Sequence, residues 1–462
     1  MIGWGLTLRA LILILLPISA ALGASPEYRA GTAVADITPE SPIRLSGYGS
    51  RTKPSEGVLT RLHAKALAIS RGKQERVVIV TTDLIGLPRS ITDVVAARVL
   101  QQYGLERSAL WFNSSHTHTG PYIKGNLPLL FQLSAEDQTA VDAYAGRLQA
   151  ALTGVIGEAL SAMQPASLGI AHGEANFAIN RREAAGGTMK IGLNPAGPVD
   201  FDVPVLRVTG ADGKTLAILF GYACHNTTLT GEFNVISGDY AGFAQEAIEK
   251  AAQAANPGAV AMFVMLCGAD QNPNPRGTVE LARRHGEALA AAVNRVLAGG
   301  MTPVKGRIRT AFRIVELEFR PNDRAGFEAI VNDPNPQVRT SARGLHAEAM
   351  LRAMDRGQTV RRYPYPVQAI SFGGDFTIVT LGGEVLVDYA LRLKRESPGR
   401  KLFFVAGYSN DVMAYIPTLR ASKEGGYEVL DSMYYYGLPA PWADDTEERI
   451  IAAARDVLNR VR

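Results

Sequence analysis

The sequence predicts an α/β fold in which mixed β-sheets pack together and are flanked by helices. Two observations predict this class. Short apolar runs, typical of buried strands, alternate along the chain with longer stretches of helical period. The chain also has 462 residues, of which 47% are hydrophobic and 20% charged, which suits a globular protein with a large core. No repeat, low-complexity tract or linker divides it, so we expect one large domain over residues 24–462.

Each predicted element rests on its own pattern. Short apolar or alternating runs predict strands at residues 29–37, 63–69, 76–82, 109–113, 166–172, 203–209, 216–223, 260–266, 306–319, 367–372, 375–381 and 402–405. Helical spacing predicts helices at residues 91–103, 136–164, 240–254, 278–297, 322–356, 385–395 and 444–461, the fifth interrupted by prolines. Residues 181–200 are rich in glycine and polar side chains, and we expect them to form a loop over the functional site.

The charge balance excludes one class of partner. The net charge is +4, from 48 basic and 44 acidic side chains, which is a weak bias over this length. No run of Lys and Arg is dense enough to form a nucleic-acid-binding surface. We therefore expect no nucleic-acid partner, and the sequence leaves the oligomeric state open.

The first residues have the layout of a secretory signal peptide. Arg9 precedes an apolar run at residues 10–21, and the small residues Gly23 and Ala24 follow. The run has about 12 residues, fewer than the roughly 20 that span a bilayer. We expect residues 1–23 to be cleaved near Gly23 or Ala24, and the mature protein to be secreted or periplasmic. The alternative is an uncleaved N-terminal anchor.

Polar side chains directly follow apolar runs in four segments, which is where α/β folds carry their sites. The segments are residues 113–121, 222–228, 266–275 and 381–384, with residues 407–418 further along the chain. In the first, His116 and His118 point the same way if the segment is extended. Structural alternatives remain: hydrogen bonding in a loop, a structural His225, a tight turn at residues 270–274, and Glu384 at a helix N-terminus. Whether the two cysteines, Cys224 and Cys267, bond to each other is open.

The histidines and the glutamate together fit a catalytic zinc site. Zinc takes imidazole nitrogen and carboxylate oxygen, and a catalytic zinc keeps one position open for water. His116, His225 and Glu384 would supply two nitrogens and one oxygen, and the metal would lower the pKa of its bound water to about 7. Their spacing forms no short motif, and the same ligand types accept manganese or iron.

The chain also resembles the neutral, non-lysosomal ceramidase family along nearly all of its length after the predicted signal peptide. The segments that carry this resemblance are residues 31–39 with Gly47-Tyr48, Ser115-His116-Thr-His118-Thr-Gly-Pro121, Ile179-Asn180-Arg181, residues 202–208, Gly383-Glu384, Ala414-Tyr415-Ile-Pro-Thr418, Tyr427-Glu428 and Tyr436-Gly437. Their order and context, more than any single one, make the resemblance specific.

This resemblance implies hydrolysis of an amide bond, as in the conversion of N-acylsphingosine to sphingosine and fatty acid, with one zinc ion. The implied zinc ligands are His116, His225, Glu384 and Tyr415. His118 would be a catalytic neighbour that relays a proton, and Arg181 would bind or polarise the substrate carbonyl. The implied partner is a small-molecule or lipid amide, and peripheral contact with a membrane is compatible with it.

Two departures from the family pattern qualify this expectation. Asn272 stands where the family has a serine that is important for catalysis, and an amide cannot act as a nucleophile by the usual acid–base route. It can donate a hydrogen bond to an oxyanion, so we expect attack by zinc hydroxide, with Tyr415, Arg181 or Asn272 stabilising the oxyanion. We also expect no C-terminal immunoglobulin-like domain, because the chain ends 47 residues after Tyr415 with a helix.

Three functions therefore remain in view. The first is a zinc amidohydrolase for an N-acyl lipid such as ceramide. The second is a zinc hydrolase for another amide or ester, which the serine-to-asparagine departure favours. The third is a metal-dependent binding protein without turnover, which the full set of His, Glu and Tyr residues disfavours.

Overall fold

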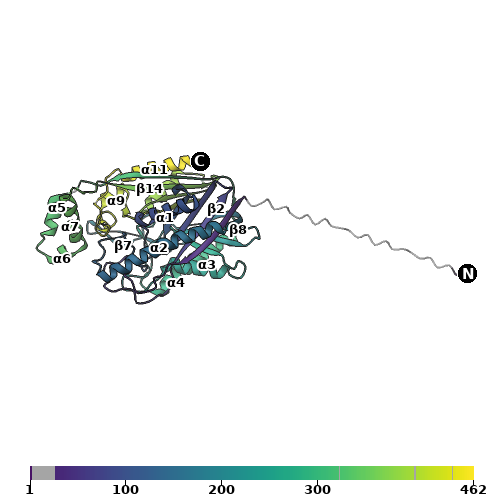
Figure 1. The fold of residues 1–462 in the computed structure, drawn as a ribbon, viewed down its shortest axis with the longest axis horizontal. Coiled ribbons are helices and arrows are strands. Elements are labelled where there is room, and N and C mark those ends of the chain that lie inside the picture. The colour runs from purple at the N-terminus through teal and green to yellow at the C-terminus, as the bar shows by residue number, and fades with distance from the viewer. Residues whose placement is uncertain (3–26, 322, 400–401, 440) are drawn as a thin grey trace.

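The computed structural model of the protein describes residues 1–2, 27–321, 323–399, 402–439 and 441–462 (Figure 1). Almost all of the predicted signal peptide therefore lies outside the described residues. Within the described ranges, no helix is both long enough and apolar enough to cross a bilayer.

A nine-stranded mixed sheet forms the centre of the fold, in the order β10-β9-β8-β5-β1-β2-β3-β4, with β12 paired to β5. Its strands are β1 Tyr28–Asp36, β2 His63–Arg71, β3 Glu75–Thr82, β4 Leu110–Ser114, β5 Gln164–Glu174, β8 Asp202–Gly210, β9 Thr215–Tyr222, β10 Val260–Met265 and β12 Thr302–Val304. The pairs β3–β4 and β9–β10 are parallel, while the other pairs are antiparallel.

A second mixed sheet has the order β13-β14-β15-β17, and two small sheets lie near it. Its strands are β13 Ile308–Glu318, β14 Arg362–Phe372, β15 Phe376–Leu381 and β17 Leu402–Ala406. The small sheets are β11 Gln271–Pro273 with β6 Ala178–Ala185 and β7 Thr188–Asn194, and β16 Glu384–Val385 with β18 Tyr415–Ile416. The β14–β15 hairpin turns at Gly373-Gly374, as the sequence predicts, and both glycines have positive φ.

The helices are α1 Arg89–Tyr103, α2 Ala135–Ser161, α3 Asp239–Ala252, α4 Val279–Ala298, α5 Arg324–Val331, α6 Pro336–Thr340, α7 Ala342–Asp355, α8 Val387–Glu396, α9 Leu419–Glu424, α10 Asp431–Tyr436 and α11 Thr446–Arg460. The longer helices α1–α4 lie over the nine-stranded sheet, and α11 lies over the second sheet. Figure 1 shows α11 along β14, and α5–α7 grouped at one end of the molecule.

Alternation of side chains along the strands produces the layers. In β9, Leu219 joins the core between the two large sheets, and its neighbour Phe220 joins the core under α3 and α4. In β14, Ile370 faces the same inter-sheet core as Leu219, while Ala369 faces the core that includes α11. The architecture is thus helix, sheet, sheet, helix, which confirms the predicted fold class.

The two edges of the nine-stranded sheet approach each other near the functional site. The side chain of Asn113, at the end of β4, donates to the carbonyl of Met265 at 3.1 Å and accepts from its amide at 2.8 Å. A fully buried carboxamide thereby replaces a backbone partner between β4 and β10. This contact brings the loops that follow β4, β9 and β10 to one place.

The expectation of a loop at residues 181–200 is wrong for most of that segment. The chain forms the β6–β7 hairpin there, turning at Gly186 and Gly187, which both have positive φ. β7 is largely exposed and pairs only with β6, so it lacks the apolar alternation that marks a half-buried strand.

Candidate active site

The loops after β4, β9, β10, β15 and β17 surround a cavity of about 230 Å³. Its walls include Gly47, Tyr48, His116, His118, Arg181, Asn272, Glu384, Tyr415, Tyr427 and Tyr436. Every catalytic or metal-ligating residue predicted from the sequence lines this cavity except His225, which lies in direct contact with Glu384 and Tyr415. The structure therefore brings together residues that are up to 299 positions apart in the sequence.

His116 follows β4 in a fixed and unusual backbone conformation. Its φ is 63°, in the left-handed region that non-glycine residues rarely adopt, and its amide donates to Leu84 O at 2.8 Å. Its Nδ1 lies 2.6 Å from Ile85 O, which acts as the acceptor when Nδ1 carries the proton. The lone pair of Nε2 is then directed to the cavity.

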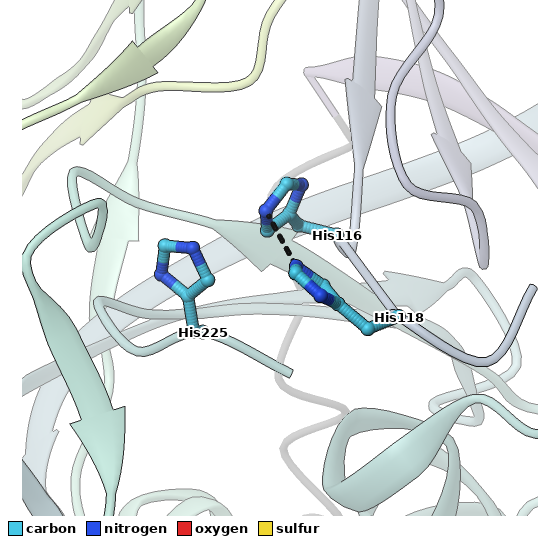
Figure 2. Close-up of side chains that lie close together, drawn as sticks. All are labelled: His116, His118 and His225. Atoms are coloured by element: carbon cyan, nitrogen blue, oxygen red, sulfur yellow. Dashed lines mark hydrogen bonds between the residues drawn. The ribbon is translucent and has the colours of Figure 1, made fainter. Parts of the chain in front are cut away.

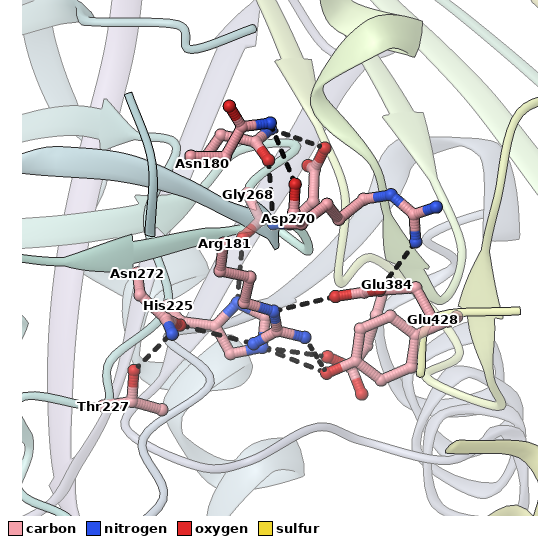
Figure 3. A network of polar contacts seen from close by, with 12 residues as sticks. Asn180, Arg181, His225, Thr227, Gly268, Asp270, Asn272, Glu384 and Glu428 are labelled. Atoms are coloured by element: carbon pink, nitrogen blue, oxygen red, sulfur yellow. Dashed lines mark hydrogen bonds and ion pairs between the residues drawn. The ribbon is translucent and has the colours of Figure 1, made fainter. Parts of the chain in front are cut away.

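His225 is held in the same way at the end of β9. Its amide donates to Gln271 O at 2.9 Å, and its Nδ1 lies 2.9 Å from Gly268 O (Figure 3). The side chain is fully buried, and its pKa falls to about 3 because of burial and the nearby charge of Arg181. The ring is therefore neutral at physiological pH, with Nε2 available as an acceptor.

Glu384 completes a set of three converging acceptors. Its Oε2 lies 3.0 Å from His116 Nε2 and 3.3 Å from His225 Nε2. Tyr436 donates to its Oε1 at 2.6 Å, and Tyr408 lies 3.5 Å from Oε2. Burial would raise the pKa of this carboxyl, but the two histidines prevail and hold it well below its usual range.

This arrangement fits a divalent metal. A carboxylate oxygen and two imidazole lone pairs meet at one point, and backbone carbonyls already occupy the Nδ1 positions of both histidines. Acceptors that face each other inside a protein repel unless a proton or a cation lies between them. Histidine with carboxylate is also a typical zinc donor set, and a second contact that fixes the tautomer is typical of ligating histidines.

His118 provides a further nitrogen at the same point. The Nε2 atoms of His118 and His116 are 3.1 Å apart, and ligand atoms of His116, His118 and His225 all lie within 4.8 Å of one another (Figure 2). The Nδ1 of His118 is buried and has no hydrogen-bond partner within the described residues. The site therefore offers two donor sets, one with Glu384 and one with three histidines.

The ring of His118 is fixed by close neighbours. Tyr48 contacts it edge-on with ring centroids 5.0 Å apart, and a side chain at Gly47 would lie 2.5 Å from the ring. Glycine at position 47 is thus required by close approach, and its φ of 90° also favours glycine. Burial and the neighbouring histidines lower the pKa of His118 well below its usual value, so its ring is neutral.

The opposite wall of the cavity carries hydrogen-bond donors. Arg181 donates to the Tyr415 hydroxyl at 3.0 Å and to Asn272 Oδ1 at 3.3 Å, and Thr227 donates to the same Oδ1 at 3.3 Å (Figure 3). An arginine can only donate, so this contact assigns the Asn272 oxygen to the arginine side. The Asn272 amide nitrogen has no other partner within the described residues, and Asn272 lines the cavity.

Tyr415 stands between the two walls. Its hydroxyl accepts from Arg181 and lies 3.2 Å from His225 Nε2, with which its ring is stacked. Burial raises the pKa of Tyr415 well above its usual value, although Arg181 acts in the opposite direction. In the metal-free protein the hydroxyl stays protonated and donates to His225.

Glu428 holds Arg181 in this position. Its Oε1 accepts from Arg181 Nε at 2.9 Å, and its Oε2 accepts from Arg182 Nη1 at 2.7 Å. All three side chains are buried, so each charge depends on its partners. Asp270 adds a second support, because its backbone carbonyl accepts from the amide of Arg181 at 2.8 Å and its carboxylate accepts from the amide of Val387 at 2.9 Å.

Sequence reasoning missed several residues of this site. Tyr408 and Tyr436 bind Glu384, Thr227 binds Asn272, and Glu428 orients Arg181. The segments Tyr427-Glu428 and Tyr436-Gly437 carry part of the family resemblance, and that was the signal available for two of them. The two cysteines are buried and unbonded, which settles the disulfide question.

Comparison with known proteins gives the family. A family model described as neutral/alkaline non-lysosomal ceramidase, N-terminal, matches residues 28–308. The chain is 24% identical over 479 residues to the neutral ceramidase of Mycobacterium tuberculosis, covering 86% of this chain and 72% of that protein. It is 26% identical over 316 residues to the neutral ceramidase of Pseudomonas aeruginosa, covering 64% of this chain and 45% of that protein.

The crystal structure of the Pseudomonas aeruginosa neutral ceramidase shares the fold. It superimposes with a TM-score of 0.72 at 19% identity, covering 94% of this chain and 74% of that chain. The matched range contains five of the seven site residues predicted from the sequence, and the other two, Glu384 and Tyr415, lie beyond its end. The model matches more than half of the sequence, and the chain belongs to the neutral/alkaline non-lysosomal ceramidase family.

Proposed function

We propose that this protein is a zinc-dependent hydrolase that cleaves the amide bond of an N-acyl lipid of the ceramide type. One observation carries the proposal: converging imidazole and carboxylate acceptors and a set of hydrogen-bond donors line a single cavity, in a chain of the ceramidase family. The names of the relatives support the substrate class, since each is called a neutral ceramidase.

The proposed zinc ligands are His116, His225, Glu384 and Tyr415. When bound there, the metal would act as a Lewis acid and lower the pKa of a water molecule at its open position. The chain's own part is to direct the Nε2 atoms of both imidazoles at the site, through the contacts of Nδ1 with Ile85 O and Gly268 O, and to keep the carboxylate ionised.

The donor wall would bind the carbonyl oxygen of the scissile amide. Asn272 offers its amide N–H groups, because Arg181 and Thr227 already donate to its oxygen. Donors held in place before reaction stabilise a developing oxyanion without reorganisation. Arg181 itself is committed to Glu428, Tyr415 and Asn272, so its role is to orient the donors and add positive charge.

His118 would move the proton that the leaving amine requires. Its neutral ring can both accept and donate, as a general acid–base catalyst must. When His116 carries its proton on Nδ1, the 3.1 Å contact between the two Nε2 atoms places the His118 proton on Nε2, and the His118 Nδ1 has no partner within the described residues. The ring therefore has one site to give a proton and one to take it.

A second candidate function is hydrolysis of a different amide or an ester. Asn272 favours it, because the resemblance places a catalytically important serine at this position in ceramidases. Replacing the serine with asparagine changes the side chain that would contact the substrate carbonyl, and such a change can alter which substrates are hydrolysed.

The test is a hydrolysis assay of the purified protein on N-dodecanoylsphingosine, N-dodecanoyl ethanolamine and a dodecanoyl ester. We expect release of dodecanoate from the sphingosine amide, loss of release with a chelator, and recovery with zinc. Release from the ester or simple amide alone would favour the second candidate. Absence of metal-dependent release from all three would contradict the proposal.

We also propose that the protein is exported, on the strength of the N-terminal sequence. N-terminal sequencing of protein from the periplasm or medium should give a first residue near Ala24 or Ser25. An intact Met1 on a membrane-bound product would contradict export with cleavage.

A further inference from the structure

A groove of about 620 Å³ lies beside the catalytic cavity. Gly49, Leu130 and Tyr435 line both, so the two hollows share a wall. The rest of the groove is formed by the segments around residues 44–52 and 129–132 and by helices α6 and α7. Among the described residues, three arginines and one glutamate line it: Arg44, Arg51, Arg339 and Glu348.

Arg44 is a buried cation without a counter-charge. It is 9% exposed, and its Nη2 donates to the backbone carbonyl of Arg51 at 2.7 Å. Its Nε is buried and has no partner, and its guanidinium stacks over the ring of Phe131 at 4.4 Å. Within the described ranges no ion pair joins Arg44 to a carboxylate, and its Nη1 makes no hydrogen bond.

Arg51 repeats this pattern beneath Arg44. It is 5% exposed, and its hydrogen bonds to other described residues all go to backbone carbonyls, those of Ser46, His118 and Phe233. Its Nε is also buried without a partner. Burial lowers its pKa to about 10, so the group is still charged at neutral pH.

The remaining charges do not compensate these two. Arg339, half-buried on α6, is bonded through Nη1 to the backbone carbonyl of Asp333. Glu348 is already paired with Arg352 at 3.1 Å. Buried charges are normally paired, because an unpaired one loses hydration without replacement. The groove is thus a positive region with an unmet requirement for an anion.

The groove is also apolar along one side. Leu129, Leu130, Phe131 and Leu345 line it next to the arginines, and Leu130 continues into the catalytic cavity. An alkyl chain with an anionic group at its end would satisfy both halves of this surface. A neutral lipid would satisfy only the apolar half.

We propose that this groove is an anion subsite for the substrate, in which Arg44, supported by Arg51 and Arg339, binds an acidic group remote from the scissile amide. A substrate that fills both hollows is then an N-acyl amphiphile that also carries a carboxylate, phosphate or sulfate, and a neutral amide such as N-dodecanoylsphingosine would occupy only the catalytic cavity. The identity of the ligand as substrate rests on the proposed function, whereas the presence of an anionic amphiphile site does not.

The test is calorimetric titration of the full-length protein with three probes. Octyl phosphate carries both the chain and the anion, inorganic phosphate carries only the anion, and octyl glucoside carries only the chain. We expect octyl phosphate to bind at least about tenfold more tightly than either of the others. Arg44→Gln should weaken octyl phosphate about tenfold or more, because a hydrogen bond between charged groups is lost.

Arg98→Gln is the matched control. The variant removes the same charge as Arg44→Gln does. Because Arg98 is exposed on α1 outside the groove, the affinity for octyl phosphate should be unchanged. If Arg44→Gln proves unstable, Arg339→Gln takes its place as the test. Its affinity for octyl phosphate should fall about threefold.

Two results would overturn the subsite. One is unchanged affinity for octyl phosphate in folded Arg44→Gln, or in Arg339→Gln when it has to decide. The other is inorganic phosphate binding as tightly as octyl phosphate, which would show a site for free anions. Because titration needs no turnover, intact binding with failed hydrolysis would count against the proposed function alone.

Discussion

The two walls of the catalytic cavity are built on opposite principles. On the acceptor side, where we propose the metal, His116, His225 and Glu384 have orientations that are fixed by backbone carbonyls and a buried tyrosine. On the other side, Arg181 and Asn272 present positive charge and donors, fixed by a buried carboxylate. One wall requires a cation and the other favours developing negative charge.

Under the proposed function, this difference should separate binding of the metal from catalysis. Changes on the acceptor wall should remove the metal, and activity with it. Changes on the donor wall should leave the metal in place and slow the reaction. Measuring metal content and turnover on the same variants therefore tests whether the division is real.

The largest effect should follow from His225→Ala. It removes one nitrogen from the proposed metal site and leaves an empty space beside Glu384. Metal content should therefore fall to background, and hydrolysis should be lost. Metal analysis of the purified protein gives the readout, together with the assay described above. His346→Ala is the control, since it removes another buried histidine, one bonded to Leu438 O outside the cavity, and should retain metal.

Asn272→Ala should reduce turnover by about 10²–10³, which is typical for loss of one oxyanion donor. Metal content should match that of the wild type, because no hydrogen bond joins Asn272 to the proposed ligands in the described structure. Asn272→Ser restores the family's residue, and a gain on N-acylsphingosine would point to a different natural substrate. Full turnover of Asn272→Ala on its true substrate would refute the assigned role.

Glu428→Gln should have a smaller effect, a fall of about tenfold in kcat, because it weakens the hold on Arg181 without removing it. The metal should again be retained, and KM should change less than kcat. Glu424→Gln is the matched control, since Glu424 pairs with Arg182 at 3.1 Å and does not touch Arg181. An equal fall in kcat for the two variants would show that Glu428 acts only through the stability of the fold.

The smallest effect concerns pH and the metal-free protein. The pKa of His225 is about 3 in the fold and near 6.5 when unfolded, so the unfolded chain binds an additional proton between these values. Unfolding free energy should therefore decline as pH falls from 7 to 5. Urea unfolding of chelated protein should show a steeper decline for wild type than for His225→Ala, and parallel curves would contradict the burial of a neutral imidazole.

The fold was predictable where hydrophobic burial sets the pattern. The strands at residues 76–82 and 216–223 are apolar because both of their faces are covered, and both were predicted close to their observed bounds. The β6–β7 hairpin was not predicted, because β7 is largely exposed, β6 buries polar side chains instead of an apolar alternation, and the paired glycines look like a loop in sequence. Its strands are defined by hydrogen bonding to each other and to β11.

The sequence indicated which residues form the site better than it indicated how they contact one another. His116, His225 and Glu384 were marked by their positions after strands and by the family resemblance. Nothing local in the sequence shows that Asn113 joins two sheet edges, or that Glu428 lies against Arg181. Those contacts span 152 and 247 positions, and they depend on how the sheets close in three dimensions.

The most direct test of the account is an anomalous diffraction measurement on crystals of the wild-type protein grown with zinc. We expect one peak bonded to His116 Nε2, His225 Nε2 and a Glu384 oxygen, at about 2.0–2.2 Å from each. A peak held by His118 with His116 and His225 but without Glu384, or no peak in this cavity, would contradict it.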